Sequence, residues 1–119
     1  MKLIAIIATA AFIASPASAK PMECVFSQKE QCQRGSPCRT VPADRMWSKL
    51  DMTAGTYSRC DAKGCDDYQG DVARSGIWAN FTFPGRAFVA KLSVDGDLVE
   101  VATFNDVTFV SYGKCRYPA

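Results

Sequence analysis

The chain has 119 residues, a net charge of +2 at pH 7, six cysteines and no histidine. Its charges are scattered and not gathered into a basic patch, which argues against a nucleic acid or an anionic membrane surface as a partner. The lack of histidine excludes Ser-His-Asp and Cys-His catalysis and removes the usual catalytic zinc ligands.

The first 19 residues have the pattern of a cleaved export signal. Lys2 supplies a positive charge, the run Leu3–Ile13 is apolar, and Ala17-Ser-Ala19 is a small-residue cleavage site. An apolar run of about eleven residues is too short to span a bilayer, which takes roughly 20. We therefore expect a signal peptide over 1–19, one mature domain over 20–119, no membrane span, and a periplasmic or extracellular location.

All six cysteines lie in the predicted mature part. An even number of cysteines in a short exported chain indicates a disulfide framework. The short spacings favour two local bridges, which leaves the first and last cysteines to tie the ends of the domain. The alternative is that Cys24 or Cys38 joins the body of the sheet and the ends stay loose. The favoured pairs are Cys32–Cys38, Cys60–Cys65 and Cys24–Cys115.

The first half of the mature chain mixes short strands with polar loops. Cys24–Ser27 could pair beside the last strand, and Gln28–Arg39 is polar with Gly and Ser-Pro, which predicts a stapled loop. The stretch Val41–Met52 is ambiguous between helix and strand. Met46 and Leu50 have helical spacing, but they also share a strand face. We favour a strand because the neighbouring segments have strand patterns.

The middle of the chain predicts a hairpin. Thr56–Cys60 is a strand candidate, Asp61–Gly64 has turn composition, and Asp66–Gln69 would return as the partner strand. Gly70–Gly76 is expected to be a polar connection into the next strands.

The last third predicts an antiparallel meander. Apolar and polar residues alternate in Ile77–Phe83, Arg86–Val94, Leu98–Phe104 and Val107–Tyr112. Asp95-Gly96 is a strong hairpin signal, because a type I′ turn needs positive φ at both central residues. The fold class expected is therefore all-β: a small antiparallel barrel or curled sheet, stapled by disulfides.

Several segments resemble a group of small exported bacterial proteins of unknown function. Its most specific pieces are Arg-Cys-Asp-Ala-Lys-Gly-Cys-Asp at 59–66 and Tyr-Gly-Lys-Cys at 112–115. The resemblance implies a bacterial periplasmic or secreted location and brings no activity with it. In architecture alone, the chain is also similar to small β-barrel inhibitors of lysozyme or proteases. The segments that carry the resemblance are Gly55–Tyr68, Ser75–Ile77, Ala90–Gly96, Glu100–Thr103 and Val110–Arg116.

The densest acidic group is Asp61, Asp66, Asp67 and Asp71. Such carboxylates could bind calcium or, as a pair, serve glycoside hydrolysis, but no ordered calcium-loop pattern is present and a domain this small offers little room for a cleft. We interpret them as turn-forming aspartates and expect the nearby Arg59 to face solvent. The cysteine spacings differ from C-x-x-C, against zinc and thiol redox chemistry. We expect no enzyme activity, no catalytic residue, no metal and no cofactor.

We predict a binding or inhibitor module that acts as a monomer through protein–protein contact. In it, a short disulfide loop, Cys60–Cys65 or Cys32–Cys38, would be held rigid for a partner, which lowers the ordering cost of binding. Aromatic side chains are enriched in binding hot spots, although they could equally fill the core of so small a domain. The candidate contact residues are Tyr57, Lys63, Tyr68, Trp78 and Tyr112.

Two other functions fit the pattern. A carrier of a small apolar ligand would need a cavity in the barrel interior lined by Phe81, Phe88 and Leu92. A structural protein that interacts with the cell envelope would show stability as its main trait.

Overall fold

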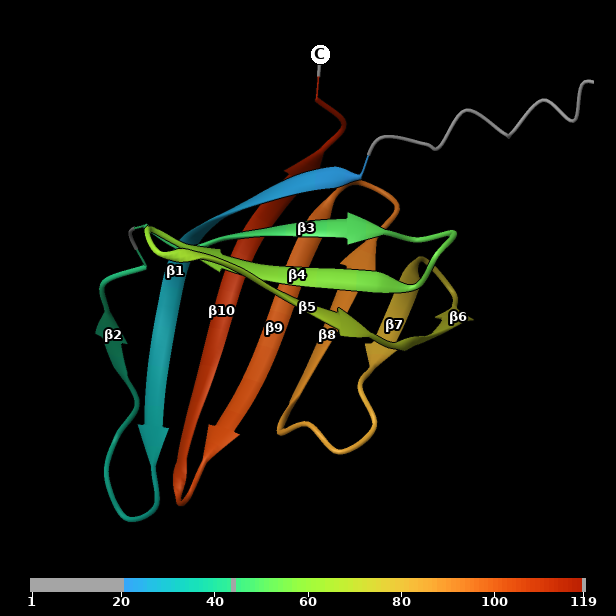
Figure 1. The fold of residues 1–119 in the computed structure, drawn as a ribbon. Coiled ribbons are helices and arrows are strands. Elements are labelled where there is room, and N and C mark those ends of the chain that lie inside the picture. The colour runs from blue at the N-terminus through green and yellow to red at the C-terminus, as the bar shows by residue number, and fades with distance from the viewer. Residues whose placement is uncertain (1–20, 44, 119) are drawn as a thin grey trace, which may run out of the picture.

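The computed structural model describes residues 21–43 and 45–118, so the signal peptide expected over 1–19 lies outside the described residues. The described part contains ten strands (Figure 1) and no helix that could cross a membrane. The strands are β1 (Met22–Gln33), β2 (Arg39–Val41), β3 (Trp47–Asp51), β4 (Thr56–Asp61), β5 (Gly64–Gln69), β6 (Asp71–Ser75), β7 (Trp78–Thr82), β8 (Phe88–Ser93), β9 (Asp97–Phe104) and β10 (Val107–Arg116).

The strands form one antiparallel sheet in the order β5-β4-β3-β1-β10-β9-β8-β7-β6, with β2 paired to β1 as a branch. The strands at the two ends of this order, β5 and β6, follow each other in the chain through Gly70. The sheet therefore curls into a nearly closed barrel, with β3, β4 and β5 crossing in front of β8, β9 and β10 (Figure 1). The expected all-β, barrel-like fold is confirmed.

Gly70 is the corner between β5 and β6. A Cβ atom at this position would lie 2.7 Å from the ring of Phe83 and 2.9 Å from the carbonyl oxygen of Thr82. Only glycine lets the two segments approach this closely. The expectation of a polar connection over Gly70–Gly76 is wrong: Asp71–Ser75 pairs with β7, because the turn at Gly76 places it directly beside that strand.

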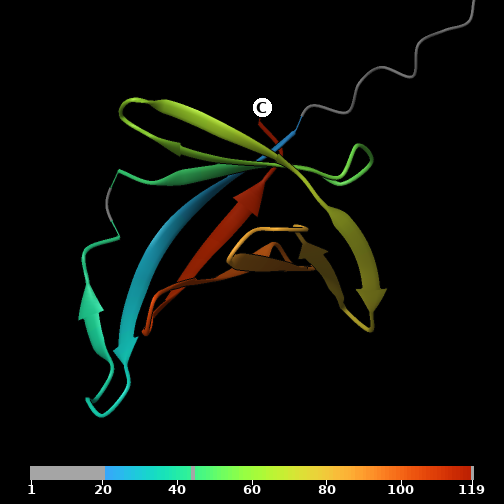
Figure 2. The same ribbon diagram turned by 60° about the horizontal axis from the view of Figure 1, so that its bottom comes forward.

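The long strand β1 bends because of a bulge. Phe26 pairs with Gly113 and Gln28 with Tyr112, so Ser27 is an extra residue. Bulges bend a strand and increase its twist, and β1 curves strongly in both views (Figures 1 and 2). Before the bulge β1 pairs with β3, and after it the same edge pairs with β2.

The polar segment predicted as a loop over Gln28–Arg39 is therefore mostly strand. β1 continues to Gln33 because the ten-residue β10 offers backbone partners along its whole length, whatever the side chains are. The prediction of a strand within Val41–Met52 is confirmed by β3.

The inner face of the barrel is aromatic. The ring of Tyr57 lies 5.4 Å from Phe83, 5.9 Å from Phe88 and 6.4 Å from Phe81, measured between centroids. Tyr57 and Phe81 have no exposed surface. Aromatic pairs at such distances add to the free energy of burial. The alternation expected for 77–83 is confirmed, since Ala79, Phe81 and Phe83 are buried.

Three disulfides hold the sheet, and the described residues include no free cysteine. Their pairs are those that the spacing favoured. Cys24–Cys115 joins directly paired residues of β1 and β10, and Cys60–Cys65 does the same for β4 and β5. Cys32–Cys38 closes the turn between β1 and β2. The first of these bridges is buried, whereas Cys65 and Cys38 are exposed.

Candidate functional site

Strand register aligns the inward side chains in rows. One row runs Lys29, Ser111, Glu100, Ala90 and Phe81 across β1, β10, β9, β8 and β7. The strands β3 and β4 lie across this row, which buries Ser111, Glu100 and Ala90 (Figure 1).

The next row begins at Arg39 of β2 and continues through Gln31, Phe109, Ala102 and Phe88. It lies toward the lower ends of β1, β9 and β10, where β3 and β4 do not cover the sheet (Figure 1). We call the inner surface at this end of the barrel the open end. Phe88 is buried at its base. Its exposed or partly exposed residues are Lys29, Gln31, Arg39, Arg59, Tyr68, Arg86, Phe104 and Phe109.

A buried carboxylate fixes the position of Arg59. Glu100 is 2% exposed, accepts a hydrogen bond from the hydroxyl of Tyr57 at 2.5 Å, and accepts another from Nη2 of Arg59 at 3.0 Å. Ser48 in turn donates to the Tyr57 oxygen at 3.1 Å. Burial and the nearby Glu100 charge raise the pKa of Tyr57 well above its ordinary value. The network holds the guanidinium at the border between core and open end.

Arg59 and Arg86 lie against aromatic rings on two sides of a pocket. The guanidinium carbon of Arg59 is 4.9 Å from the ring centroid of Phe88, and that of Arg86 is 5.2 Å from Tyr68. These are cation–π distances. The pocket has a volume of about 230 Å³ and is lined by Arg59, Tyr68, Gly85, Arg86, Ala87, Phe88 and Phe104.

Arg59 is not fully satisfied in this position. Its side chain is 23% exposed, yet its Nε atom is buried and has no hydrogen-bond partner among residues 21–43 and 45–118. Buried polar groups in folded proteins are nearly always hydrogen-bonded, so an orphan donor calls for an explanation.

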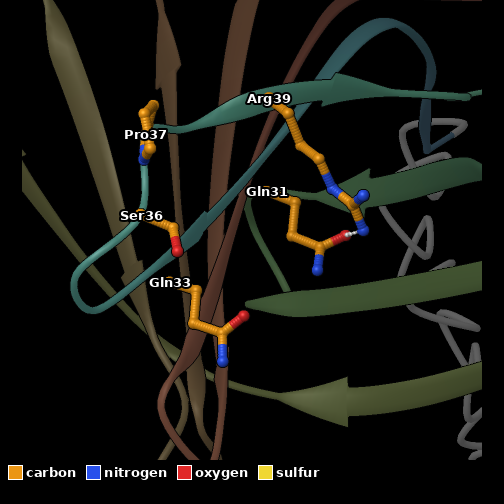
Figure 3. A pocket seen from close by; sticks show the side chains of 5 residues that line it. All are labelled: Gln31, Gln33, Ser36, Pro37 and Arg39. Carbon is orange, nitrogen blue, oxygen red and sulfur yellow. Dashed lines mark hydrogen bonds between the residues drawn. The ribbon is translucent and has the colours of Figure 1, made fainter.

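A second hollow, of about 220 Å³, lies at the turn between β1 and β2 (Figure 3). Gln31 and Gln33 project from the same side of β1, and Nη2 of Arg39 donates to Oε1 of Gln31 at 3.3 Å. Ser36 and Pro37 complete the lining. The Cys32–Cys38 bridge closes this turn, so the polar hollow has a fixed frame.

The open end is cationic. Lys29 lies 4.7 Å from the ring centroid of Phe109, and the exposed Arg39 and Arg86 form no ion pair with any carboxylate of the described residues. Glu100 offsets Arg59, and the exposed Asp66 sits opposite Arg59 in the β4–β5 pairing. A concave surface with excess charge of one sign attracts partners of the other sign.

The five contact residues predicted from the sequence do not form one site. Tyr57 is fully buried, so the expectation that it meets a partner is wrong; the core needs its ring and Glu100 needs its hydroxyl. Lys63 lies in the exposed turn after β4. Tyr68 lines the Arg59 pocket. Trp78 and Tyr112 lie on the outer face, as their alternation with Phe81 and Ser111 requires.

Sequence reasoning missed Arg59, Arg86, Phe104 and Phe109. Arg59 was expected to face solvent, but it shares a strand face with Tyr57, two residues earlier. The alternation of side chains along this strand could have predicted that Arg59 faces inward. Its partner Glu100 lies 41 residues away, and no local pattern connects the two.

The aspartates do not gather. Asp66 and Asp67 project to opposite faces of β5 because side chains alternate along a strand; Asp67 accepts a hydrogen bond from Ser58 at 2.5 Å, and Asp61 accepts one from the backbone of Lys63 at 2.8 Å. Among the described residues, no group of three or more potential ligand side chains could hold a metal ion. The geometry therefore does not support a calcium site or a pair of carboxylates for glycoside hydrolysis.

Fold and site together define a small, disulfide-linked, all-β barrel with a cationic and aromatic open end. No protein-family model, no curated protein and no solved structure matches the chain.

Proposed function

We propose that this protein is an exported binding module that acts on a partner protein through the open end, in the manner of an inhibitor and without catalysis. The observation that carries the proposal is the contrast between a filled core and an exposed inner surface. Phe104 is 53% exposed although it lies on the same strand face as the buried Leu98 and Ala102. Exposed aromatic and arginine side chains on a concave surface are the usual anchors of protein interfaces.

The scaffold supports this role because it is rigid where it frames the surface. The Cys32–Cys38 bridge fixes the turn before Arg39. Phe109 pairs with Gln31 on one side and Ala102 on the other, and Phe104 pairs with Val107 of β10. Side chains on a preformed surface lose less conformational freedom on binding than those on a mobile loop. The three disulfides are consistent with an oxidising compartment outside the cytosol.

The geometry gives less support to the carrier of an apolar ligand. Tyr57 lies between Phe81 and Phe88, with centroid distances of 6.4 Å and 5.9 Å, so side chains occupy the interior space that a ligand would need. The pocket near Phe88 instead opens toward two arginines.

The proposal is tested by photo-crosslinking in the exporting cell. A benzophenone amino acid placed at Phe104 should trap a discrete protein, whereas the same group at Val89, which is 47% exposed on the outer face, should not. The purified protein should then inhibit the trapped partner, with lysozymes and extracellular proteases as the first panel. A crosslink from Val89 alone, or from neither position, would contradict the proposal.

A further inference from the structure

We propose that the pocket between Arg59 and Arg86 binds a side-chain carboxylate from an acidic segment of the partner protein. The inference rests on the proposed function and names the chemistry that its surface recognises. It is drawn from the partly exposed guanidinium of Arg59, the second arginine, and the size and charge of the space between them.

The first step concerns the donors that Arg59 has left. A guanidinium carries five N–H groups in a planar fork. Glu100 accepts from Nη2, and the buried Nε has no acceptor within the described residues. The Nε atom has almost no accessible surface although the side chain is 23% exposed, so a group from outside would reach Arg59 through the Nη hydrogens that Glu100 does not accept. Carboxylates accept paired N–H groups of arginine in a bidentate geometry.

The second step concerns the shape of the pocket. The rings of Phe88 and Tyr68 support the two guanidinium groups, and Phe104 forms part of the rim. The volume of about 230 Å³ is below the roughly 300–1,000 Å³ of sites for drug-sized ligands. The space therefore suits one side chain that projects from a larger partner.

The third step concerns charge. Arg59 and Arg86 contribute two positive charges and the buried Glu100 one negative charge, which leaves a single positive charge for an incoming group. A carboxylate carries one negative charge, whereas a phosphate group carries nearly two at neutral pH. Asp66, opposite Arg59 in the strand pairing, is exposed and forms no ion pair with Arg59, so solvent screens its charge and it offsets the positive charge only in part. This partial offset disfavours a doubly charged group further.

The test measures fluorescence anisotropy of two rhodamine-labelled Ser-Gly peptides, one with a central Glu-Leu-Glu and the other with Gln-Leu-Gln. The protein should bind the glutamate peptide about tenfold more tightly, because hydrogen bonds to a charged acceptor are the stronger kind. Arg86→Gln should weaken binding of the glutamate peptide by a similar factor. Arg59→Lys should weaken it too, since lysine keeps a charge for Glu100 but lacks the planar fork of Nη donors.

Lys91→Gln is the matched control. Lys91 is also an exposed cation over a ring, 4.8 Å from the centroid of Trp78, but it lies on the outer face of β8. This variant should bind the glutamate peptide as the unmodified protein does. Equal affinity for both peptides, no binding of either, or unchanged binding by Arg86→Gln would overturn the proposal. So would inorganic phosphate that displaces the peptide better than chloride at equal ionic strength.

These outcomes are separable from the fate of the proposed function. A crosslink from Phe104 together with equal affinity for the two peptides would leave a protein-binding open end that does not select carboxylates. Binding of the glutamate peptide without any crosslink would leave an anion pocket with no protein partner.

Discussion

The inner face of the barrel has two regions that differ in what their side chains do. In the region covered by β3 and β4, Tyr57, Phe81 and Leu98 are buried and contact one another or their neighbours in the core. At the open end, Phe104 lies on the same face of the same sheet and Arg86 in the connection between β7 and β8, and both remain exposed. The comparison teaches that one continuous sheet can supply both a core and a recognition surface, because the crossing strands cover only part of its length.

The largest difference in the free energy of unfolding should be found between variants that lack the disulfide of one region or of the other. Replacing both Cys24 and Cys115 with serine should lower the free energy of unfolding by about 4–5 kcal/mol, because the bridge spans 91 residues and limits the unfolded chain strongly. Replacing Cys32 and Cys38, six residues apart beside the open end, should cost about 2 kcal/mol. Urea unfolding of the two double variants measures this. Equal losses would show that loop length does not govern the contribution.

The next largest difference in stability should be found when an aromatic ring is removed from each region. Phe81→Ala removes a ring with no exposed surface and should cost about 3–5 kcal/mol. Phe104→Ala should cost under about 1 kcal/mol, since half of that ring is already in water. The midpoints of urea unfolding of both variants test the comparison. A costly Phe104→Ala would mean that the open end belongs to the core.

The buried Tyr57 should make stability fall in alkali. Its raised pKa means that above about pH 10 the unfolded state loses the phenol proton while the folded state keeps it. The free energy of unfolding should then drop by about 1.4 kcal/mol per pH unit until the folded pKa is reached. Tyr57→Phe should remove this slope, and Tyr112→Phe, on the exposed outer face, should keep it. A slope that persists in Tyr57→Phe would assign the effect to another group.

The smallest effect is expected at Lys114. Hydrogen bonding and attraction to Asp97 raise its pKa, but the side chain is exposed and the pair is screened by solvent. Lys114→Gln should leave the unfolding midpoint unchanged within error. A measurable loss would show that exposed ion pairs on the outer side of the sheet matter as much as the buried Arg59–Glu100 pair.

The strands from 77 to 112 could be predicted because their alternation and turns are local signals. Gln28–Gln33 and Asp71–Ser75 could not, since their side chains are mostly polar and only the neighbouring ladders make them strands. The open end was beyond prediction for a related reason. It exists because register places Gln31, Phe109 and Phe88 in one row, and register across several strands depends on the bulge at Ser27.

The central claim is that Arg59 is held by Glu100 with a donor free for a carboxylate. Nitrogen-15 NMR of the arginine side chains tests it most directly. On addition of the glutamate peptide, the Nη–H signals of Arg59 and Arg86 should shift and become protected from exchange with water, while those of Arg116, at the end of β10, stay unchanged. Uniform small shifts of all three signals, or shifts equally produced by the glutamine peptide, would contradict the account.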